Sequence, residues 1–515
     1  MKTFSSRIGV LLAAAGSAVG LGSIWKFAVA VFTGWFVPQA RYQGIEIGFM
    51  HLSCSLALDH THRYYHCFPQ FSKYYMIRVF FVVSLLVSSL SVYAQTDSTK
   101  VNTLSFGLNF LTHGETVSGG LPVDGDAENE EKSNFLLGRT RLIAGYSRPG
   151  LEAHAVIQNL AVWGSSGNQA LNLYEAWVKM TAKNGLFAQA GRIALAYDDE
   201  RIIGSNDFAM ASLSHDVLRV GYEGHGHQAH AIVAYNQNVE NVYKSTYYED
   251  GSQPYKTMQT VWYHYDVPKF PLGASLLFMN VGLQAGKKGN AVNPPTTEYQ
   301  QMYGGYLNFH PKYVTLEGSY YRQGGKTVMG NKAFELDAWM ASAKATVTPS
   351  DYYGFTLGYD YLSGDDFVPS TYGGRLGMPL HKVFKGFSPL YGSRTKFYGL
   401  MDYFYQSAYN SSFTPGLQNA FVGIFGKPTK KLDLNATYHY LAVTTDLYEL
   451  NRTLGHSIDV MASYSFTKDI SLTAGYTLMF GTETMDCLKQ GNDSKTARWG
   501  WFSLVISPTL FTTKF

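Results

Sequence analysis

The most constraining feature of this chain of 515 residues is a repeat that runs from Val101 to the C-terminus. Its unit is a stretch of about ten residues of alternating character, followed by a turn that is alternately short and long. In the first stretch, Leu104, Phe106 and Leu108 share one face, while Ser105 and Gly107 share the other. Because side chains alternate between the two faces of an extended chain, this unit predicts a β-strand with one apolar face.

We expect about 18 such strands, an even number within the range of antiparallel barrels that cross the bacterial outer membrane. The candidate strands cover residues 104–110, 136–146, 151–162, 171–181, 186–196, 216–223, 228–236, 259–267, 273–285, 299–309, 313–321, 335–347, 352–362, 417–426, 432–441, 457–466, 471–480 and 499–507. Tight turns such as Arg148-Pro149-Gly150 and Pro311-Lys312 separate some neighbours. They alternate with long polar loops near 112–133, 197–215, 238–257, 322–334, 364–416, 442–455 and 481–498. The predicted fold class is therefore all-β, a transmembrane antiparallel β-barrel with both termini on the periplasmic side.

The longest loop requires a choice. Thr395 to Tyr405 has the character of a strand, but a strand there would break the up-and-down order before the turn at 427–431. We therefore assign residues 364–416 to one external loop. A loop of that length is usually functional, and we expect it to fold into the lumen.

Composition agrees with a barrel. Tyr (38), Phe (32) and Gly (51) are abundant, whereas charged residues make up only 15%. After residue 94 no apolar run reaches 18 residues, so membrane entry would require a closed barrel. The formal charge of the whole chain is +3, and its positive sign comes from residues 1–94, which contain seven Lys or Arg and two Asp or Glu. No basic run favours nucleic-acid binding. Cys487 is the only cysteine of the barrel part and excludes an internal disulfide there.

Met76 to Ala94 has the pattern of a secretory signal peptide. Arg78 precedes a short apolar core, and Val92-Tyr93-Ala94 offers small residues where a signal peptidase cleaves. A buried strand or helix is the alternative. We expect cleavage near Ala94 and export of residues 95–515 to the outer membrane.

Residues 1–75 are predicted to be an artefactual or fused leader, with Met76 as the natural initiator. Within them, Ser5 to Phe27 (SSRIGVLLAAAGSAVGLGSIWKF) resembles the first membrane helix of neurotransmitter:sodium symporters. The site of such a transporter needs several discontinuous helices from two repeats, and no others follow here. A sodium symporter is therefore not expected.

Residues 95–515 resemble the alginate-export family of outer-membrane barrels. The likeness is carried by Gly191-Arg192 followed by Tyr197 to Gly204 (YDDERIIG) and by Lys396 to Phe404 (KFYGLMDYF). The C-terminal run from Gly416, through Gly481 to Met485, to Trp499-Gly500-Trp501 resembles Bacteroidetes members in particular. The resemblance implies a porin-like channel of 18 strands with a basic lumen for an acidic polysaccharide. Phe515 is a terminal residue of the kind that the barrel-assembly machinery recognises.

Six basic residues are the candidate lumen or solute-binding residues. We expect three of them to face the lumen: Arg139, Arg141 and Arg192. Three others lie in or beside long loops at the mouth: Arg201, Arg394 and Lys396. Guanidinium groups there would pair with carboxylates of a passing solute. The alternative is that they brace the wall by pairing with Glu152, Glu175 or Asp402, and both roles remain open.

Other constellations are weaker. The acidic stretch Asp124 to Glu131 is a calcium candidate, but a solvated loop explains it better. His225, His227 and His230 are a metal candidate at a predicted periplasmic turn. Ser214-His215-Asp216 has the residue types of a catalytic triad, but residues that are adjacent in sequence do not have triad geometry. We therefore expect no enzyme, no cofactor and no metal.

The function predicted from the sequence is an outer-membrane channel that passes solutes, including anionic saccharides, by diffusion through a loop-constricted and partly basic lumen. The expected partners are outer-membrane lipid, small solutes or an acidic oligosaccharide, and the assembly machinery, with no nucleic acid. A rim-active lipase or protease and a non-conducting structural or adhesion barrel are the alternatives.

Overall fold

The computed structural model describes residues 101–119, 132–165, 169–238, 247–248, 253–368, 375, 378–379, 383–401, 414–489 and 496–515. The leader 1–75, the signal peptide 76–94, the boundary at 95 and the acidic stretch 124–131 lie outside these residues, as does Asp402. The interpretations given to them stay predictions.

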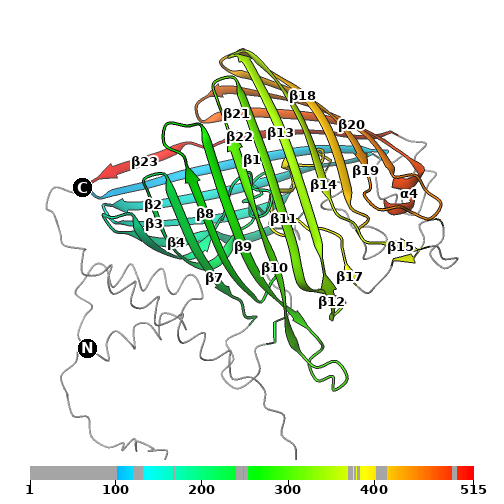
Figure 1. Ribbon diagram of the computed structural model, residues 1–515. Coiled ribbons are helices and arrows are strands. Elements are labelled where there is room, and N and C mark those ends of the chain that lie inside the picture. The colour runs from blue at the N-terminus through cyan, green and yellow to red at the C-terminus, as the bar shows by residue number, and fades with distance from the viewer. Residues whose placement is uncertain are drawn as a thin grey trace, which may run out of the picture. The chain divides into compact units, whose positions relative to one another are not determined.

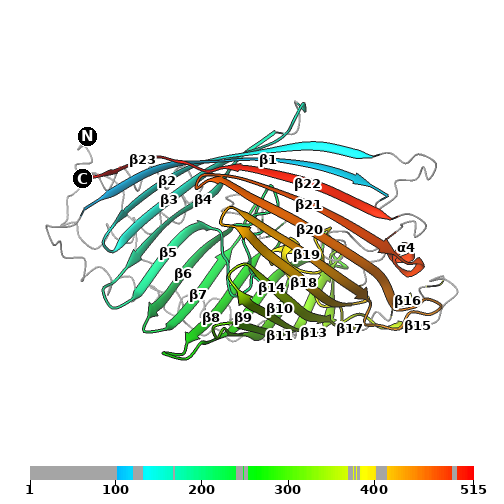
Figure 2. The same ribbon diagram turned by 90° about the horizontal axis from the view of Figure 1, so that it is seen from above.

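Eighteen antiparallel strands of the described residues close into a barrel (Figures 1 and 2). They are β1 (Thr103–Ser118), β2 (Ser133–Arg148), β3 (Leu151–Val162), β4 (Gln169–Thr181), β5 (Leu186–Ile193), β6 (His215–Gly224), β7 (His227–Tyr235), β8 (Thr257–Asp266), β9 (Leu272–Ala285), β10 (Thr296–Phe309), β11 (Val314–Met329), β13 (Ala338–Ser350), β14 (Tyr353–Leu362), β18 (Leu417–Thr429), β19 (Leu432–Ala442), β20 (Thr453–Thr467), β21 (Ile470–Gly481) and β22 (Ala497–Ile506), which β23 (Thr509–Lys514) continues. Each strand pairs with the next strand of the wall, so the predicted fold class is confirmed.

The two ends of the barrel chain meet at one seam. β1 pairs with β22 along its second half and with β23 along its first half, the register shifts between Phe106 and Gly107, and Pro508 lies between β22 and β23. Proline cannot donate to a strand ladder, which explains why the last strand is interrupted there. The rings of Phe106 and Phe511 lie 4.9 Å apart on the outer side of this seam.

All 18 predicted strands are present, but two predicted loops are partly strand: β1 continues to Ser118, into the predicted loop 112–133, and the predicted loop 322–334 is a hairpin. Residues 322–334 were expected to be irregular, whereas β11 continues to Met329 and pairs with β12 (Lys332–Leu336). Gly330 and Asn331 join them with φ angles of 53° and 67°. Two residues with positive φ suit a tight hairpin, so the Gly-Asn pair was the available signal. The short strand β23 and helix α4 (Glu483–Lys489) were also not predicted.

Three further short strands lie between β14 and β18: β15 (Phe367–Val368), β16 (Met378–Pro379) and β17 (Val383–Phe384). β17 pairs with β12, and the 3-10 helix η2 (Arg394–Lys396) follows it. No helix in the described ranges is both long enough and apolar enough to cross a lipid bilayer.

The outer face of the wall carries large apolar side chains. Leu276, Leu357 and Ile424 are 66%, 64% and 56% exposed, each on a strand whose neighbouring side chains point inward. Alternation along the strands therefore places these apolar side chains on the outer face and the intervening side chains on the inner face.

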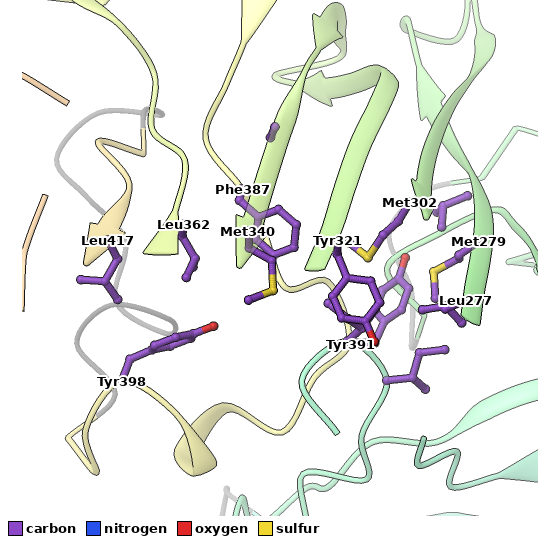
Figure 3. Packing of buried hydrophobic residues seen from close by; sticks show 14 of the residues in the cluster. Leu277, Met279, Met302, Tyr321, Met340, Leu362, Phe387, Tyr391, Tyr398 and Leu417 are labelled. Atoms are coloured by element: carbon purple, nitrogen blue, oxygen red, sulfur yellow. The ribbon is translucent and has the colours of Figure 1, made fainter. Parts of the chain in front are cut away.

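Part of the inner face is also apolar. We call Met279, Met302, Met340, Leu362 and Leu417 the apolar stripe, since they lie on β9, β10, β13, β14 and β18. Tyr321 on β11, between β10 and β13, pairs with Met340 and completes the row. Figure 3 shows these side chains facing aromatic residues that do not belong to the wall. The three methionines have no exposed surface, and burial of such a side chain contributes about 1.5–3 kcal/mol.

Candidate functional site

Residues 194–214, between β5 and β6, cross the interior of the barrel, and we call them the first inner segment. Asp198 accepts hydrogen bonds from Trp262 on β8 at 3.1 and 3.2 Å, and Arg201 pairs with Asp360 on β14 at 3.0 Å. Further along, the Phe208 ring packs 5.0 Å from that of Trp501 on β22. β8, β14 and β22 are far apart around the barrel, and one short segment contacts all three because it lies inside the barrel.

Residues 383–401 form a second inner segment. Phe387 donates its amide to the carbonyl of Ser363 at 2.9 Å, and Gln323 on β11 donates to the carbonyl of Ser388 at 2.8 Å. The amide of Leu400 donates to the carboxylate of Asp459 on β20 at 3.0 Å. The prediction that the loop 364–416 folds into the lumen is thus confirmed for residues 383–401, whereas the inward course of the first inner segment was not predicted.

The two inner segments are bonded to each other. Ile203 and Tyr391 form a parallel bridge, in which the amide of Gly204 donates to Tyr391 at 2.9 Å and that of Tyr391 donates to Ile202 at 3.1 Å. A Cβ atom at Gly204 would lie 2.4 Å from Ser393 Oγ, so glycine permits this approach. Phe387 and Tyr391 of the second inner segment belong to the same buried cluster as the apolar stripe (Figure 3).

Arg201 is the centre of this junction. Its side chain is 6% exposed and donates to Asp199 at 3.1 Å, to Asp360 at 3.0 Å and to the hydroxyl of Tyr398 at 3.1 Å. The guanidinium also lies 4.0 Å from the centre of the Phe397 ring. Burial alone would lower the pKa of Arg201, but Asp360, Tyr398 and Asp199 raise it above its ordinary value. The guanidinium therefore stays charged and holds both inner segments to the wall.

A series of polar contacts extends from this junction across four neighbouring strands of the wall, from β14 to β20. Asp360 accepts from Asn419 at 2.8 Å, Asn419 contacts His439 at 2.9 Å, and His439 lies 3.5 Å from Asp459, which receives the amide of Leu400. The series thus begins at the first inner segment and ends at the second. Such networks specify one arrangement when every member is satisfied.

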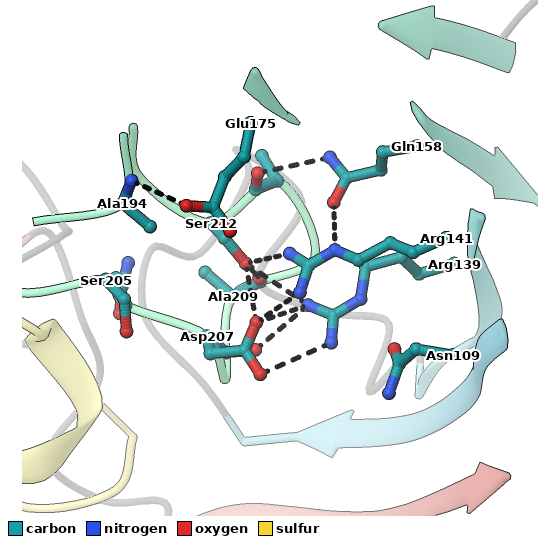
Figure 4. A network of polar contacts seen from close by, with 12 residues as sticks. Asn109, Arg139, Arg141, Gln158, Glu175, Ala194, Ser205, Asp207, Ala209 and Ser212 are labelled. Atoms are coloured by element: carbon teal, nitrogen blue, oxygen red, sulfur yellow. Dashed lines mark hydrogen bonds and ion pairs between the residues drawn. The ribbon is translucent and has the colours of Figure 1, made fainter. Parts of the chain in front are cut away.

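Arg139 and Arg141 face the lumen, as predicted, and meet a carboxylate of the first inner segment (Figure 4). Arg141 pairs with Asp207 Oδ1 at 2.7 Å and Arg139 pairs with the same atom at 3.2 Å. Ser212 accepts from Arg141 at 2.7 Å, and Gln158 Oε1 accepts from Arg141 Nε at 2.7 Å. We call these five residues the arginine cluster.

The predicted bracing partners were wrong for these two arginines. Their carboxylate partner is Asp207, not Glu152 or Glu175; Glu175 instead accepts the amide of Ala194 at 3.1 Å. Burial would raise the pKa of Asp207, but the charges of Arg139 and Arg141 hold it below its ordinary value of 3.8.

The prediction that Arg192 faces the lumen was also wrong. Arg192 pairs bidentately with Asp216 across β5 and β6, at 2.8 and 2.6 Å. On these two strands Gln189 and Arg219 are paired and face inward. Arg192 is three positions from Gln189 on β5, and Asp216 is three positions from Arg219 on β6, so Arg192 lies on the outer face. Both faces of β5 mix small, apolar and polar side chains, which left the parity ambiguous in the sequence.

The remaining predicted residues lie on the inner segments. Lys396 forms an ion pair with Glu200, whose carboxylate also accepts from Ser393 Oγ at 2.7 Å. Burial opposes this ionised state, but Lys396 and Ser393 lower the pKa of Glu200 overall. Arg394 begins η2, so its backbone lies beside these groups.

The histidines and the serine motif do not assemble into a centre. His230 contacts Tyr197 at 3.0 Å and His227 contacts Tyr263 at 2.8 Å, and no group of three or more metal-ligating side chains occurs in the described part of the chain. His215 and Asp216 are consecutive on β6, so their side chains point to opposite faces.

Two residues of the site were missed in the sequence. Asp360 lies between Tyr359 and Tyr361 in a predicted strand, and an acid at an inward position needs a buried partner; that was a usable signal. Asp207 lies in a polar loop, and nothing in the neighbouring sequence indicates that it contacts Arg141 and Arg139, which are 66 and 68 residues away.

No known protein family matches the chain, the alginate-export family included, and no curated protein sequence matches either. Both family resemblances therefore stay predictions. The fold is similar to solved structures from Pseudomonas. OccK9 (OpdG) of Pseudomonas aeruginosa has a TM-score of 0.53 at 14% identity, over 79% of this chain and 98% of that one. OpdL of the same organism has a TM-score of 0.52 at 11% identity, over 79% and 99%.

A third similar structure is a BenF-like porin from Pseudomonas fluorescens Pf-5, with a TM-score of 0.51 at 11% identity over 79% of this chain and 99% of that one. At such identities the likeness establishes the barrel fold alone.

Proposed function

We propose that the protein is an outer-membrane channel through which solutes diffuse past the two inner segments, with preference for solutes that carry acidic groups. The observation that carries this proposal is the pair of inner segments, which narrow a closed barrel and of which the first meets the arginine cluster. A wall with an apolar outside suits a lipid environment, and one structure of similar fold is a porin. Location in the bacterial outer membrane after cleavage near Ala94 is part of the same proposal.

The acidic preference rests on charge. Two guanidinium groups and one carboxylate give the arginine cluster a net positive charge at neutral pH. Arg201 and Lys396 at the junction add to the cationic groups on the inner segments, although each has acidic partners. Anionic saccharides are one class of solute that would meet this field.

The decisive experiment is planar-bilayer conductance of the full chain, purified from bacterial membranes, under a potassium chloride gradient. We expect discrete channels with a reversal potential that favours chloride. Silent protein that still migrates as a heat-modifiable barrel would contradict the channel and leave a structural or enzymatic barrel.

Removing both arginines tests the acidic preference. Arg139→Ala with Arg141→Ala leaves Asp207 as the only charge of the cluster, so the chloride-over-potassium permeability ratio should fall below that of the parent. Arg322→Ala is the matched control, because Arg322 pairs with Asp337 on exposed surface at 2.8 Å. An unchanged ratio in the double variant would mean that both arginines only brace the first inner segment.

A further inference from the structure

The arginine cluster has an unusual distribution of exposure. The side chains of Arg139 and Arg141 are 1% and 8% exposed, whereas that of Asp207, which neutralises part of their charge, is 56% exposed. The carboxylate therefore covers the two cations on the side that is open to solvent. A solute that approaches the cluster meets Asp207 first.

The hydrogen bonds of the cluster are incomplete. Among the described residues, Nε of Arg139 has no acceptor and the nearby Oδ1 of Asn109 has no donor, and both atoms are buried (Figure 4). Arg139 Nη2 lies 3.5 Å from Asp207 Oδ2, longer than the 2.7 Å contact that Arg141 makes to Oδ1. A buried donor without a partner is destabilising, so one aspartate does not satisfy this pair of cations fully.

Asp207 is carried on a small closed loop. The amide of Leu213 donates to Ser205 at 2.7 Å, and the loop between them turns through left-handed Asn206 and Ser212, with φ angles of 47° and 53°. The loop is attached to the wall by the two arginines, by Gln158, which donates to the carbonyl of Ala211 at 3.3 Å, and by the Phe208 ring, which packs 5.0 Å from that of Trp501. Of these contacts, the ion pairs of Asp207 with the arginines are the ones that another anion could replace.

We propose that Asp207 is a tethered carboxylate that occupies the two-arginine site, and that a carboxylate of a solute displaces it during passage. Asp207 is thus a specificity-determining residue: it weakens the hold of the arginines on any single anion and keeps the site from trapping the solute. This inference rests on the proposed function and adds to it the group that competes with the solute. Passage requires that a site bind well enough to admit a solute and loosely enough to release it.

The test is Asp207→Asn in the full chain purified from membranes, with succinate as the probe. Without the competing charge, the succinate concentration that halves the chloride current should fall about tenfold, which corresponds to ~1.4 kcal/mol. The chloride-over-potassium ratio should rise at the same time. Asp337→Asn removes the same charge from the exposed Arg322 pair and is the matched control, expected to leave both values unchanged.

The outcomes separate the two proposals. Absence of channels in the parent protein overturns the proposed function. Channels in the parent with the same succinate block in Asp207→Asn overturn only the tethered carboxylate, as does an equal shift in Asp337→Asn. Should Asp207→Asn fail to fold, hydrogen exchange of the parent decides: succinate should accelerate exchange at residues 205–213, and unchanged exchange overturns the inference.

Discussion

Arg201→Met is expected to unlock both inner segments at once. The substitution leaves Asp360, whose side chain is 2% exposed, and Asp199 without their shared cation. Breaking a buried pair by removing one partner costs about 3–5 kcal/mol, because the remaining charge has no compensation. We expect the variant to lose heat-modifiable migration at a lower temperature than the parent, and its inner segments to become cleavable by added protease.

The matched control is Arg452→Met. Arg452 contacts Asp446 at 2.6 Å, but the two side chains are 48% and 85% exposed, so its loss should cost roughly 0–1 kcal/mol. The double variant Arg201→Met with Asp360→Asn should recover part of the loss, since it removes the stranded charge. Equal effects of Arg201→Met and Arg452→Met would show that the junction does not depend on the buried cation.

Replacing residues 366–413 with a short Gly-Ser linker is expected to raise single-channel conductance several-fold. The ends of this loop already meet, because the amide of Asp365 donates to the carbonyl of Thr414 at 2.8 Å. A short linker therefore closes the gap without moving β14 or β18. Loss of the second inner segment removes one of the two segments that narrow the lumen, and it also frees the first, which pairs with it at Ile203.

The same deletion should weaken the barrel. Phe387 and Tyr391, which are 2% and 6% exposed, would be lost from the apolar cluster, and part of the apolar stripe would face water. Replacement of residues 287–294, a loop between β9 and β10, is the control for loop shortening as such. Conductance equal to that of the parent would mean that the second inner segment does not limit the passage.

The wall of the barrel was predictable because its information is local. Alternation with a period of two and the chemistry of turns such as Arg148-Pro149-Gly150 fix each strand within about ten residues of sequence. Where the prediction failed, at residues 322–334, a local signal was present in Gly330-Asn331 and was overlooked.

The interior was less predictable because its contacts are not local. Arg139 and Arg141 could be placed on an inward face from their spacing, but their partner Asp207 depends on where a loop enters the closed barrel. Arg201 was recognised as a candidate residue, yet its role as a buried junction follows only from Asp360 on a distant strand. Arg192 shows that a single error in strand parity reverses the assignment of a side chain.

The seam between the first and last strands has a consequence for biogenesis. Asn109 and Ser507 contact each other across a separation of 398 residues, whereas every other pair of adjacent wall strands is close in the sequence. Until the final strand joins the sheet, β1 therefore presents an unpaired edge, and unpaired edges are templates for association with other chains. The growing wall can accumulate hairpin by hairpin, but ring closure is a single late event with a large loop-closure entropy. Pairing of β1 with β22 and β23 is thus the contact that removes the last open edge of the wall.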